Sequence, residues 1–234
     1  MHPLDNPIWQ VLISTHAGFA EICNAARKFP REVSILAGFS EPTPENYDSL
    51  ATLLSPGERV GLFLQDPPDP PAPWTVVHNI PILQMVCGDR NSPAVSSNPR
   101  SPDPKLIALT QADVPEMLAL TKLTKPGPFG ARTHEMGDYI GVRDAGRLAA
   151  MAGERLRLPG YTEISAVCTH PDYLGHGFAS VLMGVLMDRI YSRSELPFLH
   201  VRPENVRAIQ VYDRLGFTKR ASLRYVVLRH QKEE

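Results

Sequence analysis

With 234 residues and a formal net charge of -1 at pH 7, the chain is long enough to bury one large core or two small ones, and it has no overall charge that would attract nucleic acid or a membrane surface. The expected partner is therefore a small molecule. The three cysteines, Cys23, Cys87 and Cys168, fit neither a disulfide framework nor a metal site, and the sequence has neither a leader-like start nor an apolar run of about 18 residues, so we expect a cytoplasmic protein.

The first part of the chain predicts helices and strands without obvious chemistry. Apolar residues between Trp9 and Cys23 suggest a helical region. A second helix is expected to begin at Thr43-Pro44, a cap followed by proline in the first turn, and to end at Pro56-Gly57. Residues 59–64 and 74–86 are then predicted to be strands that could pair as neighbours in one sheet.

Residues 88–104, GDRNSPAVSSNPRSPDP, are rich in proline, serine and asparagine and contain almost nothing that could be buried. This composition is typical of a linker. We therefore expect an N-terminal α/β domain over residues 1–87, a linker over 88–104 and a second domain over 105–234.

The second half has sharper patterns. A strand is predicted over residues 106–109, and a helix is predicted to follow Asp113, which with Glu116 resembles a capping box. Residues 139–143 and 147–158 are expected to form a hairpin. A strand over 162–168 should alternate Ile164, Ala166 and Cys168 on one face with Glu163, Ser165 and Val167 on the other.

The stretch from Val167 to Ile190 predicts a strand end, a glycine loop and a long amphipathic helix. Gly175 and Gly177 precede the helix, where the absence of side chains leaves room for a ligand. The first N–H groups of a helix have no partner within it, so this position suits an anion, and a pyrophosphate best of all. Beyond it we expect a strand over 197–201, a helix capped by Asn205, and a final strand over 221–229.

Two motifs in this half match a known family. Residues 105–230 resemble the GNAT N-acetyltransferase superfamily, and EISAVCTHPDYLGHGFA resembles its glycine N-acyltransferase-like branch. The family's cofactor loop, Q/R-x-x-G-x-G/A, falls on Leu174, Gly177 and Ala179, and Leu174 departs from the pattern. The family's N-x-x-A-x-x-x-Y followed by L-G-F is matched by Asn205, Ala208, Tyr212, Leu215, Gly216 and Phe217.

The resemblance implies an α/β fold with a mixed, twisted sheet flanked by helices, preceded by a related but degenerate first half. It also implies acetyl-CoA as cosubstrate, with its pyrophosphate on the loop amides. The residues expected to bind this cosubstrate are Val167, Cys168, Thr169, Gly175, His176, Gly177, Phe178, Ala179, Ser180, Asn205 and Tyr212.

The resemblance further implies transfer of an acyl group from the thioester to an amine by direct attack. An amine must lose its proton before it can attack, and Glu163 is the candidate base, acting through a water. A backbone N–H near Val167 or Cys168 is expected to stabilise the thioester oxygen, and Tyr212 to protonate the departing thiolate. The acceptor is expected to be a small-molecule amine or an amino acid.

Other interpretations remain open at this point. Glu163 can be a solvated strand-end carboxylate, Tyr212 a core aromatic residue, and Cys168 a small buried residue and not a nucleophile. Because Leu174 replaces the usual basic residue, the chain can also be a non-catalytic module that binds acyl-CoA. A dinucleotide-dependent oxidoreductase is disfavoured, since Ser180 stands where G-x-G-x-x-G requires its last glycine.

Overall fold

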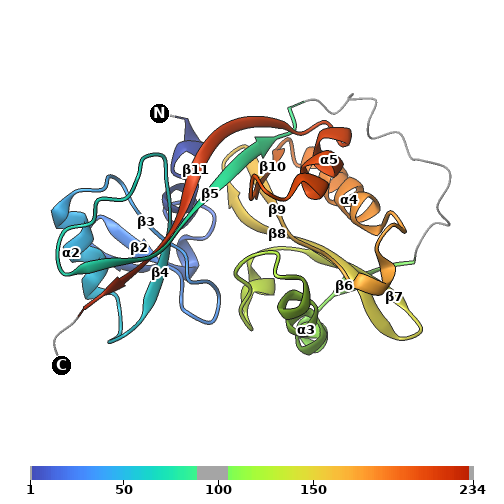
Figure 1. Ribbon diagram of the computed structural model, residues 1–234, viewed down its shortest axis with the longest axis horizontal. Helices are drawn as coiled ribbons and strands as arrows, with labels where there is room; N and C mark the ends of the chain where they lie inside the picture. The colour runs from blue at the N-terminus through green and yellow to red at the C-terminus, as the bar shows by residue number, and fades with distance from the viewer. Residues whose placement is uncertain (1, 89–104, 232–234) are drawn as a thin grey trace.

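The computed structural model describes residues 2–88 and 105–231, so almost all of the predicted linker lies outside the described residues. Its main element is an eight-stranded sheet with the order β4-β11-β5-β10-β9-β8-β7-β6. Within this sheet β9 and β10 run parallel and every other neighbouring pair is antiparallel. The expected α/β fold with a mixed sheet flanked by helices is therefore confirmed (Figure 1).

The strands of the main sheet are β4 (Arg59–Leu64), β5 (Trp74–Val86), β6 (Leu106–Leu109), β7 (Tyr139–Asp144), β8 (Arg147–Leu158), β9 (Tyr161–Thr169), β10 (Leu196–Val201) and β11 (Thr218–His230). A small three-stranded sheet contains β1 (Glu21–Cys23), β2 (Ala26–Lys28) and β3 (Ala37–Phe39). The α-helices are α1 (Pro7–Leu12), α2 (Pro44–Thr52), α3 (Val114–Thr124), α4 (Phe178–Ser192) and α5 (Val206–Arg214). None of the helices in the described ranges is long and apolar enough to cross a membrane.

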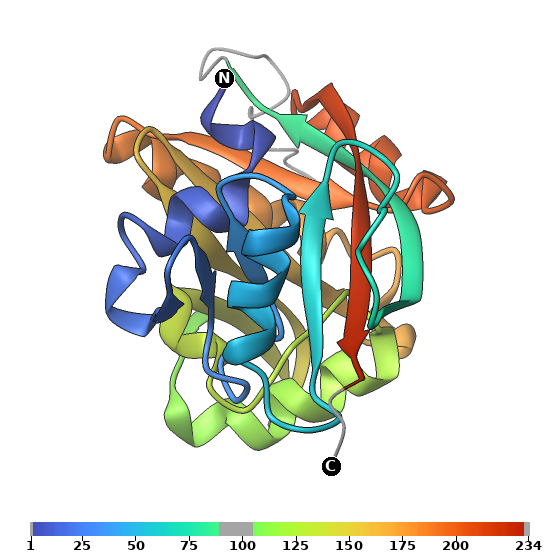
Figure 2. The ribbon, with the colours of Figure 1, turned by 90° about the vertical axis from the view of Figure 1, so that its left-hand side faces the viewer.

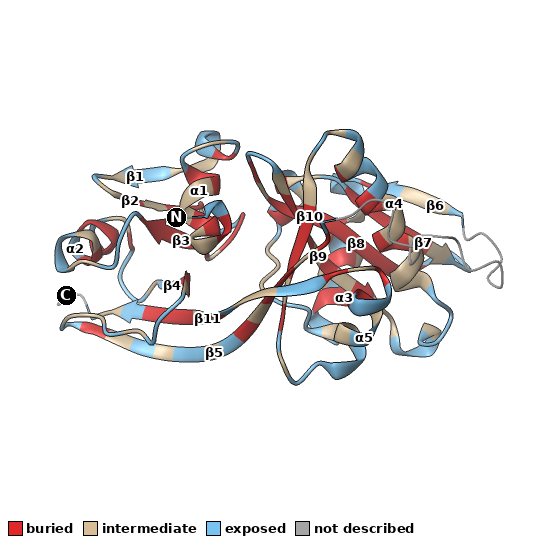
Figure 3. Cartoon of the chain, turned by 90° about the horizontal axis from the view of Figure 1, so that it is seen from above, coloured by how far each residue is buried: buried red, intermediate tan, exposed pale blue. Residues whose placement is uncertain are grey.

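Helices cover both faces of the second half of the sheet. On one face, α4 and α5 bury a cluster that includes Leu182, Leu186 and Tyr212. On the other face, α3 packs Met117 and Leu120 against Tyr139 and other sheet residues. Buried residues are accordingly concentrated in the central strands β8, β9 and β10 (Figure 3).

The expected pairing of β4 with β5 is wrong. The last strand of the chain, β11, lies between them and pairs with both (Figure 2). Because β5 also pairs with β10, the strands of the first half extend the same sheet that carries the second half. A local pattern of apolar residues defines each strand but carries no information on which distant strand lies beside it.

Two predicted helix boundaries also differ from the structure. The helical region expected between Trp9 and Cys23 ends as an α-helix at Leu12, and Glu21–Cys23 forms β1. The capping box before α3 is formed by Thr110 and Asp113, whose side chains bond each other's backbone N–H groups, and not by Asp113 and Glu116. Both errors come from apolar or acidic residues whose spacing fits more than one local structure.

The predicted alternation along β9 breaks at Ala166. Ile164 packs into the cluster under α4, whereas Ala166 and Cys168 pack into the cluster under α3. The pairing of β9 with β8 shifts register between Ser165 and Cys168, and Ala166 has a φ of 51°, so one extra residue forms a β-bulge at this point. The bulge turns the end of β9 over, and the strand then pairs with β8 again at Cys168 and Thr169.

Candidate active site

The candidate active site is a cavity of about 220 Å³ at the point where β9 and β10 diverge. These parallel strands pair only at Leu196–Phe198 against Tyr161–Glu163, so the residues after Glu163 have no partner on β10. The cavity opens there. It is lined by the bulged segment of β9, the end of β10, the start of α5 and the loop after α3, among them Ile164, Ser165, Ala166, Val167, His200, Val201, Asn205, Tyr212, Pro126 and Gly127.

The glycine loop beside this cavity has the backbone that the sequence predicts. Gly175 and Gly177 have φ values of 90° and 78°, in the left-handed region that favours glycine. A Cβ on Gly175 would meet no atom within 4 Å, so open space lies in front of the loop. Gly177 is the N-cap of α4 and provides no side-chain acceptor, which leaves the N–H groups of the first turn of α4 for an external anion.

The loop and the cavity adjoin the same apolar cluster. Phe178 at the start of α4 and Val167 of β9 pack against the same apolar cluster that contains Tyr212. A ligand with a pyrophosphate at the α4 N-terminus and a thiol-bearing arm in the cavity would therefore contact α4, β9 and α5 together. The residues present thus fit coenzyme A.

Tyr212 and Asn205 come into the cavity from α5. Asn205 also caps α5, because its side chain accepts a hydrogen bond from the backbone N–H of Ala208 at 3.2 Å. Burial raises the pKa of Tyr212 to about 12, so its hydroxyl keeps its proton throughout the neutral range. The hydroxyl is therefore available as a donor to a group in the cavity.

Glu163 is not a solvated carboxylate. Its side chain is 1% exposed, and it accepts hydrogen bonds from Nε and Nη2 of Arg155 at 2.8 and 2.7 Å. Burial alone would raise the pKa of Glu163, but the Arg155 guanidinium and a hydrogen bond from His200 lower it to about 2. Glu163 stays ionised at neutral pH, and it lies behind Arg155 and His200, which line the cavity.

His200 connects Glu163 to the rest of the sheet. Its Nδ1 lies 2.7 Å from Oε1 of Glu163, and its Nε2 lies 3.1 Å from the amide nitrogen of Gln84, which also donates to the carbonyl of Leu4. An amide nitrogen can only donate, so Nε2 must accept and the hydrogen of the neutral ring must be on Nδ1, directed at Glu163. The network therefore fixes the ring's tautomer and orientation.

Sequence reasoning did not single out His200, and it assigned no role to Arg155. The sequence places His200 on the predicted strand over residues 197–201, but its contact with Glu163 depends on the register of β9 and β10, which only the structure shows. Phe198 lies opposite Glu163 in the parallel pairing of β10 with β9, so the side chain two residues further along faces the same side of the sheet. Arg155 is harder still to place from sequence, because a register shift between Glu154 and Arg157 changes its partner on β9.

The other sequence candidates lie around this site. Cys168 is buried under α3, and burial raises the pKa of its thiol to about 12, which leaves it unreactive as a nucleophile. Neither Cys168 nor Thr169 lines the cavity, although the adjacent Val167 does. The loop and helix residues from Gly175 to Ser180 also lie outside its lining, as expected for residues that would hold a distant phosphate group.

Comparisons with known proteins identify the fold and the family. A family model described as FR47-like protein matches residues 139–226. A crystal structure from Novosphingobium aromaticivorans DSM 12444, of a protein assigned to the GNAT family of acetyltransferases, is 35% identical over 99% of this chain and 100% of its own, with a TM-score of 0.87. A GCN5-related N-acetyltransferase from Kribbella flavida matches over 97% of each chain at 15% identity with a TM-score of 0.61, which shows a similar fold.

No curated protein matches the sequence. On its similarity to the Novosphingobium protein over the full length, the chain belongs to the GNAT family of acetyltransferases.

Proposed function

We propose that this protein transfers an acetyl or other acyl group from acetyl-CoA to the amine of a small molecule or amino acid, by direct attack in a ternary complex. The observation that carries the proposal is the cavity between β9 and β10, next to an uncapped helix start. We assign the chain to the glycine N-acyltransferase-like branch on the segment EISAVCTHPDYLGHGFA. A cytoplasmic location stays a prediction.

Bound acetyl-CoA would supply a thioester carbonyl for the amine to attack. The first-turn amides of α4, at Phe178, Ala179 and Ser180, hold the pyrophosphate in this proposal. A backbone N–H in the bulged segment of β9, near Val167, donates to the thioester oxygen as charge develops there. This N–H can donate to a ligand because β9 no longer pairs with β10 beyond Glu163.

The proton of the amine is proposed to leave through the pair formed by His200 and Glu163. A carboxylate with a pKa of about 2 is itself a weak base, so Glu163 serves as a positioning residue. Glu163 accepts the hydrogen bond from Nδ1 of His200, so the lone pair of the ring is on Nε2. The negative charge of Glu163 then stabilises the ring when Nε2 takes the proton of the amine. The hydrogen bond from Gln84 to Nε2 has to be exchanged for that proton.

Tyr212 is proposed to donate its proton to the departing sulfur. Its hydroxyl carries a proton at every pH at which the protein would work, because burial raises its pKa to about 12. The tyrosine lies on α5 and lines the cavity together with Asn205, whose side chain caps the start of the helix. The leaving group and the proton donor would thus meet inside the cavity.

A second candidate function, a non-catalytic module that binds acyl-CoA, is favoured by one residue. Leu174 is 47% exposed at the position where the family pattern has glutamine or arginine. An exposed leucine adds no charge or hydrogen bond to a phosphate group. Such a module would bind acetyl-CoA through the loop amides and show no turnover.

The test is an assay of the purified protein with acetyl-CoA and a panel of amines, which follows the release of free CoA. The proposal expects turnover with at least one amine, together with calorimetric binding of acetyl-CoA. Binding without turnover against every amine would support the non-catalytic module instead. Absence of binding would remove both candidates.

A further inference from the structure

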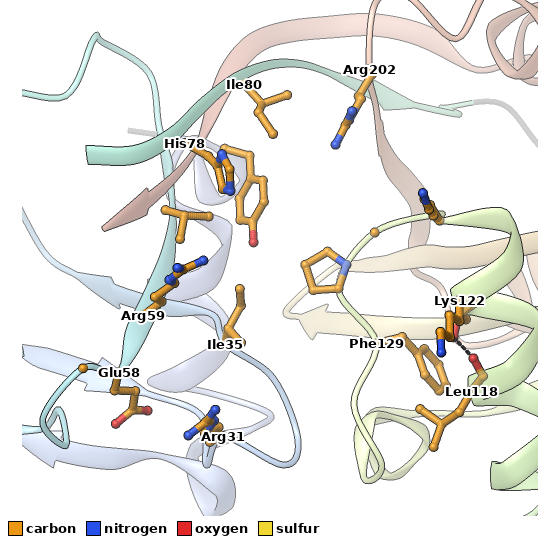
Figure 4. A pocket seen from close by; sticks show the side chains of 17 residues that line it. Arg31, Ile35, Glu58, Arg59, His78, Ile80, Leu118, Lys122, Phe129 and Arg202 are labelled. Carbon is orange, nitrogen blue, oxygen red and sulfur yellow. Dashed lines mark hydrogen bonds between the residues drawn. The ribbon is translucent and has the colours of Figure 1, made fainter. Parts of the chain in front are cut away.

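A second, larger cleft adjoins the catalytic cavity. It has a volume of about 940 Å³ and shares lining residues with that cavity, namely Ile80, Lys125, Gly127, Pro128, Arg202 and Tyr225. Figure 4 shows one wall formed by the strands of the first half and the other by α3 and the loop that follows it. A molecule held in this cleft can therefore extend a reactive group into the catalytic cavity.

The cleft gathers positive charge. Five of its lining residues have basic side chains: Arg31, Arg59, Lys122, Lys125 and Arg202. Among the described residues none of these five side chains forms an ion pair, whereas Arg143, Arg147, Arg157 and Arg193 elsewhere each do.

One carboxylate, Glu58, also lines the cleft, and it shares Lys28 Nζ with Glu21, each at 3.0 Å. Lys28 does not line the cleft. Even counted as a full negative charge, Glu58 is outnumbered by the five cations of the lining. In a chain with a net charge of -1, this concentration of cations is a property of the cleft and not of the protein as a whole.

The cations also occupy opposite walls. Arg31 and Arg59 lie on the wall of the first half, Lys122 lies on the wall of α3, and Arg202 points into the gap from above (Figure 4). A single negative group would meet one wall and leave the other uncompensated. The glycine loop of residues 175–180 lies outside the lining of both cavities, so these cations are separate from the expected pyrophosphate site.

We propose that the acceptor is a small amine that carries at least two negative groups, carboxylates or phosphates. These groups contact the cations on the two walls of the cleft, and the amine enters the catalytic cavity past Tyr225 and Gly127. The proposal deepens the proposed function and rests on it for the transfer step, while binding of the anionic amine does not depend on turnover.

The test compares matched amines that differ in charge. Glutamate is compared with glutamine, and phosphoserine with serine, by calorimetric binding to the protein and by the kcat/KM for CoA release from acetyl-CoA. We expect the anionic member of at least one pair to bind at least tenfold more tightly, and its advantage to shrink as salt rises. The preferred pair shows whether carboxylate or phosphate is recognised.

Two variants localise the effect. Arg59→Gln and Arg31→Gln should each weaken binding of the preferred anionic amine about tenfold and leave binding of its neutral partner unchanged. Arg59→Lys keeps the positive charge and should keep most of the binding. Arg224→Gln is the control, because Arg224 precedes Tyr225 on β11 and its side chain points to the other face of the strand.

The outcomes separate this proposal from the proposed function. Equal or tighter binding of the neutral amines, or no effect of Arg59→Gln and Arg31→Gln, would overturn the anionic acceptor even if the neutral amines are acetylated. Charge-selective binding that the two variants abolish, without turnover, would uphold the cleft and count against the acyl transfer alone.

Discussion

At the scale of single residues, Glu163 and His200 are expected to act as one unit. Glu163→Gln keeps the shape of the side chain but removes the charge that supports the histidine, and His200→Asn removes the ring. Each change should lower kcat about 100-fold, within the range typical of general base catalysis. Because Glu163 acts through His200, the double variant should be no slower than the slower single variant.

The kinetic measurement for this pair is a double-mutant cycle on kcat, recorded across pH 6 to 9. Glu195→Gln is the matched control, since Glu195 is a shielded carboxylate paired with Arg157 outside the cavity. Losses that multiply in the double variant would mean that Glu163 contributes independently of the ring. Normal turnover of Glu163→Gln would remove the carboxylate from the mechanism.

Tyr212→Phe tests the proposed proton donor. The change keeps the ring, which packs in the cluster under α4, and removes only the hydroxyl. We expect kcat to fall at least tenfold with little change in the KM for acetyl-CoA, because the hydroxyl is needed only as the sulfur departs. Tyr191→Phe, which changes a tyrosine packed against the same cluster but outside the cavity lining, is the control. Unchanged kcat in Tyr212→Phe would make Tyr212 a core residue.

At the scale of elements, the loop before α4 gives a prediction of increased affinity. Leu174 is 47% exposed, so an arginine there displaces nothing and brings a cation close to the expected pyrophosphate. Leu174→Arg should lower the dissociation constant of acetyl-CoA about threefold to tenfold, as measured by calorimetry. Leu123→Arg adds the same charge at an exposed site on α3 and should have no effect. Equal affinities in Leu174→Arg and the unchanged protein would place the pyrophosphate elsewhere.

Most elements of the sheet could be predicted from sequence because their patterns are local. Strands β4, β5 and β6 match the expected ranges fully, and the hairpin of β7 and β8 turns at Asp144–Arg147 as expected. The bulge at Ala166 could not be predicted. An alternating pattern assumes that each residue of one strand lies opposite one residue of the next, and the sequence does not show where an extra residue is inserted. The bulged segment lines the cavity. The shape of the cavity therefore depends on strand register, which the sequence could not predict.

At the scale of the whole molecule, the two halves share both a sheet and a core. Leu4, Phe29 and Phe63 of the first half pack in one cluster with Leu156 and Phe198 of the second. The predicted boundaries at residues 87 and 105, and the kinship of the first half to the second, stay predictions.

A partly buried polar chain also crosses between the halves. Arg220 donates to Asp5 and to Gln84, and Gln84 in turn bonds His200. The N-terminal segment therefore supports the proposed catalytic ring. Sequence reasoning could not find this chain, because its members are more than 100 residues apart in places and share no motif.

His16 gives a prediction for the stability of the whole fold. Burial lowers the pKa of His16 to about 4, so the folded protein favours the neutral ring and unfolding takes up a proton below pH 6.5. The free energy of unfolding should be unaffected by His16 above pH 6.5 and fall by up to about 3 kcal/mol as the pH drops towards 4.

Denaturant unfolding at several pH values measures this dependence. In His16→Phe, which preserves an aromatic ring beside Phe19 and Phe29, the fall between pH 6.5 and 4 should be smaller by that amount. Glu163 affects the free energy of unfolding at lower pH. Because its pKa is lowered to about 2, ionised Glu163 stabilises the fold above pH 4.5, and this stabilisation is lost between pH 4.5 and about 2. Parallel pH curves for the variant and the unchanged protein would rule out His16 as the cause.

The most direct test of the account is a crystal structure of the protein with acetyl-CoA. We expect the pyrophosphate within hydrogen-bond distance of the backbone N–H groups at the start of α4, and the thioester in the cavity between β9 and β10, beside Tyr212 and His200. A complex with the cosubstrate bound elsewhere, or with this cavity closed by side chains, would contradict the assignment of the site.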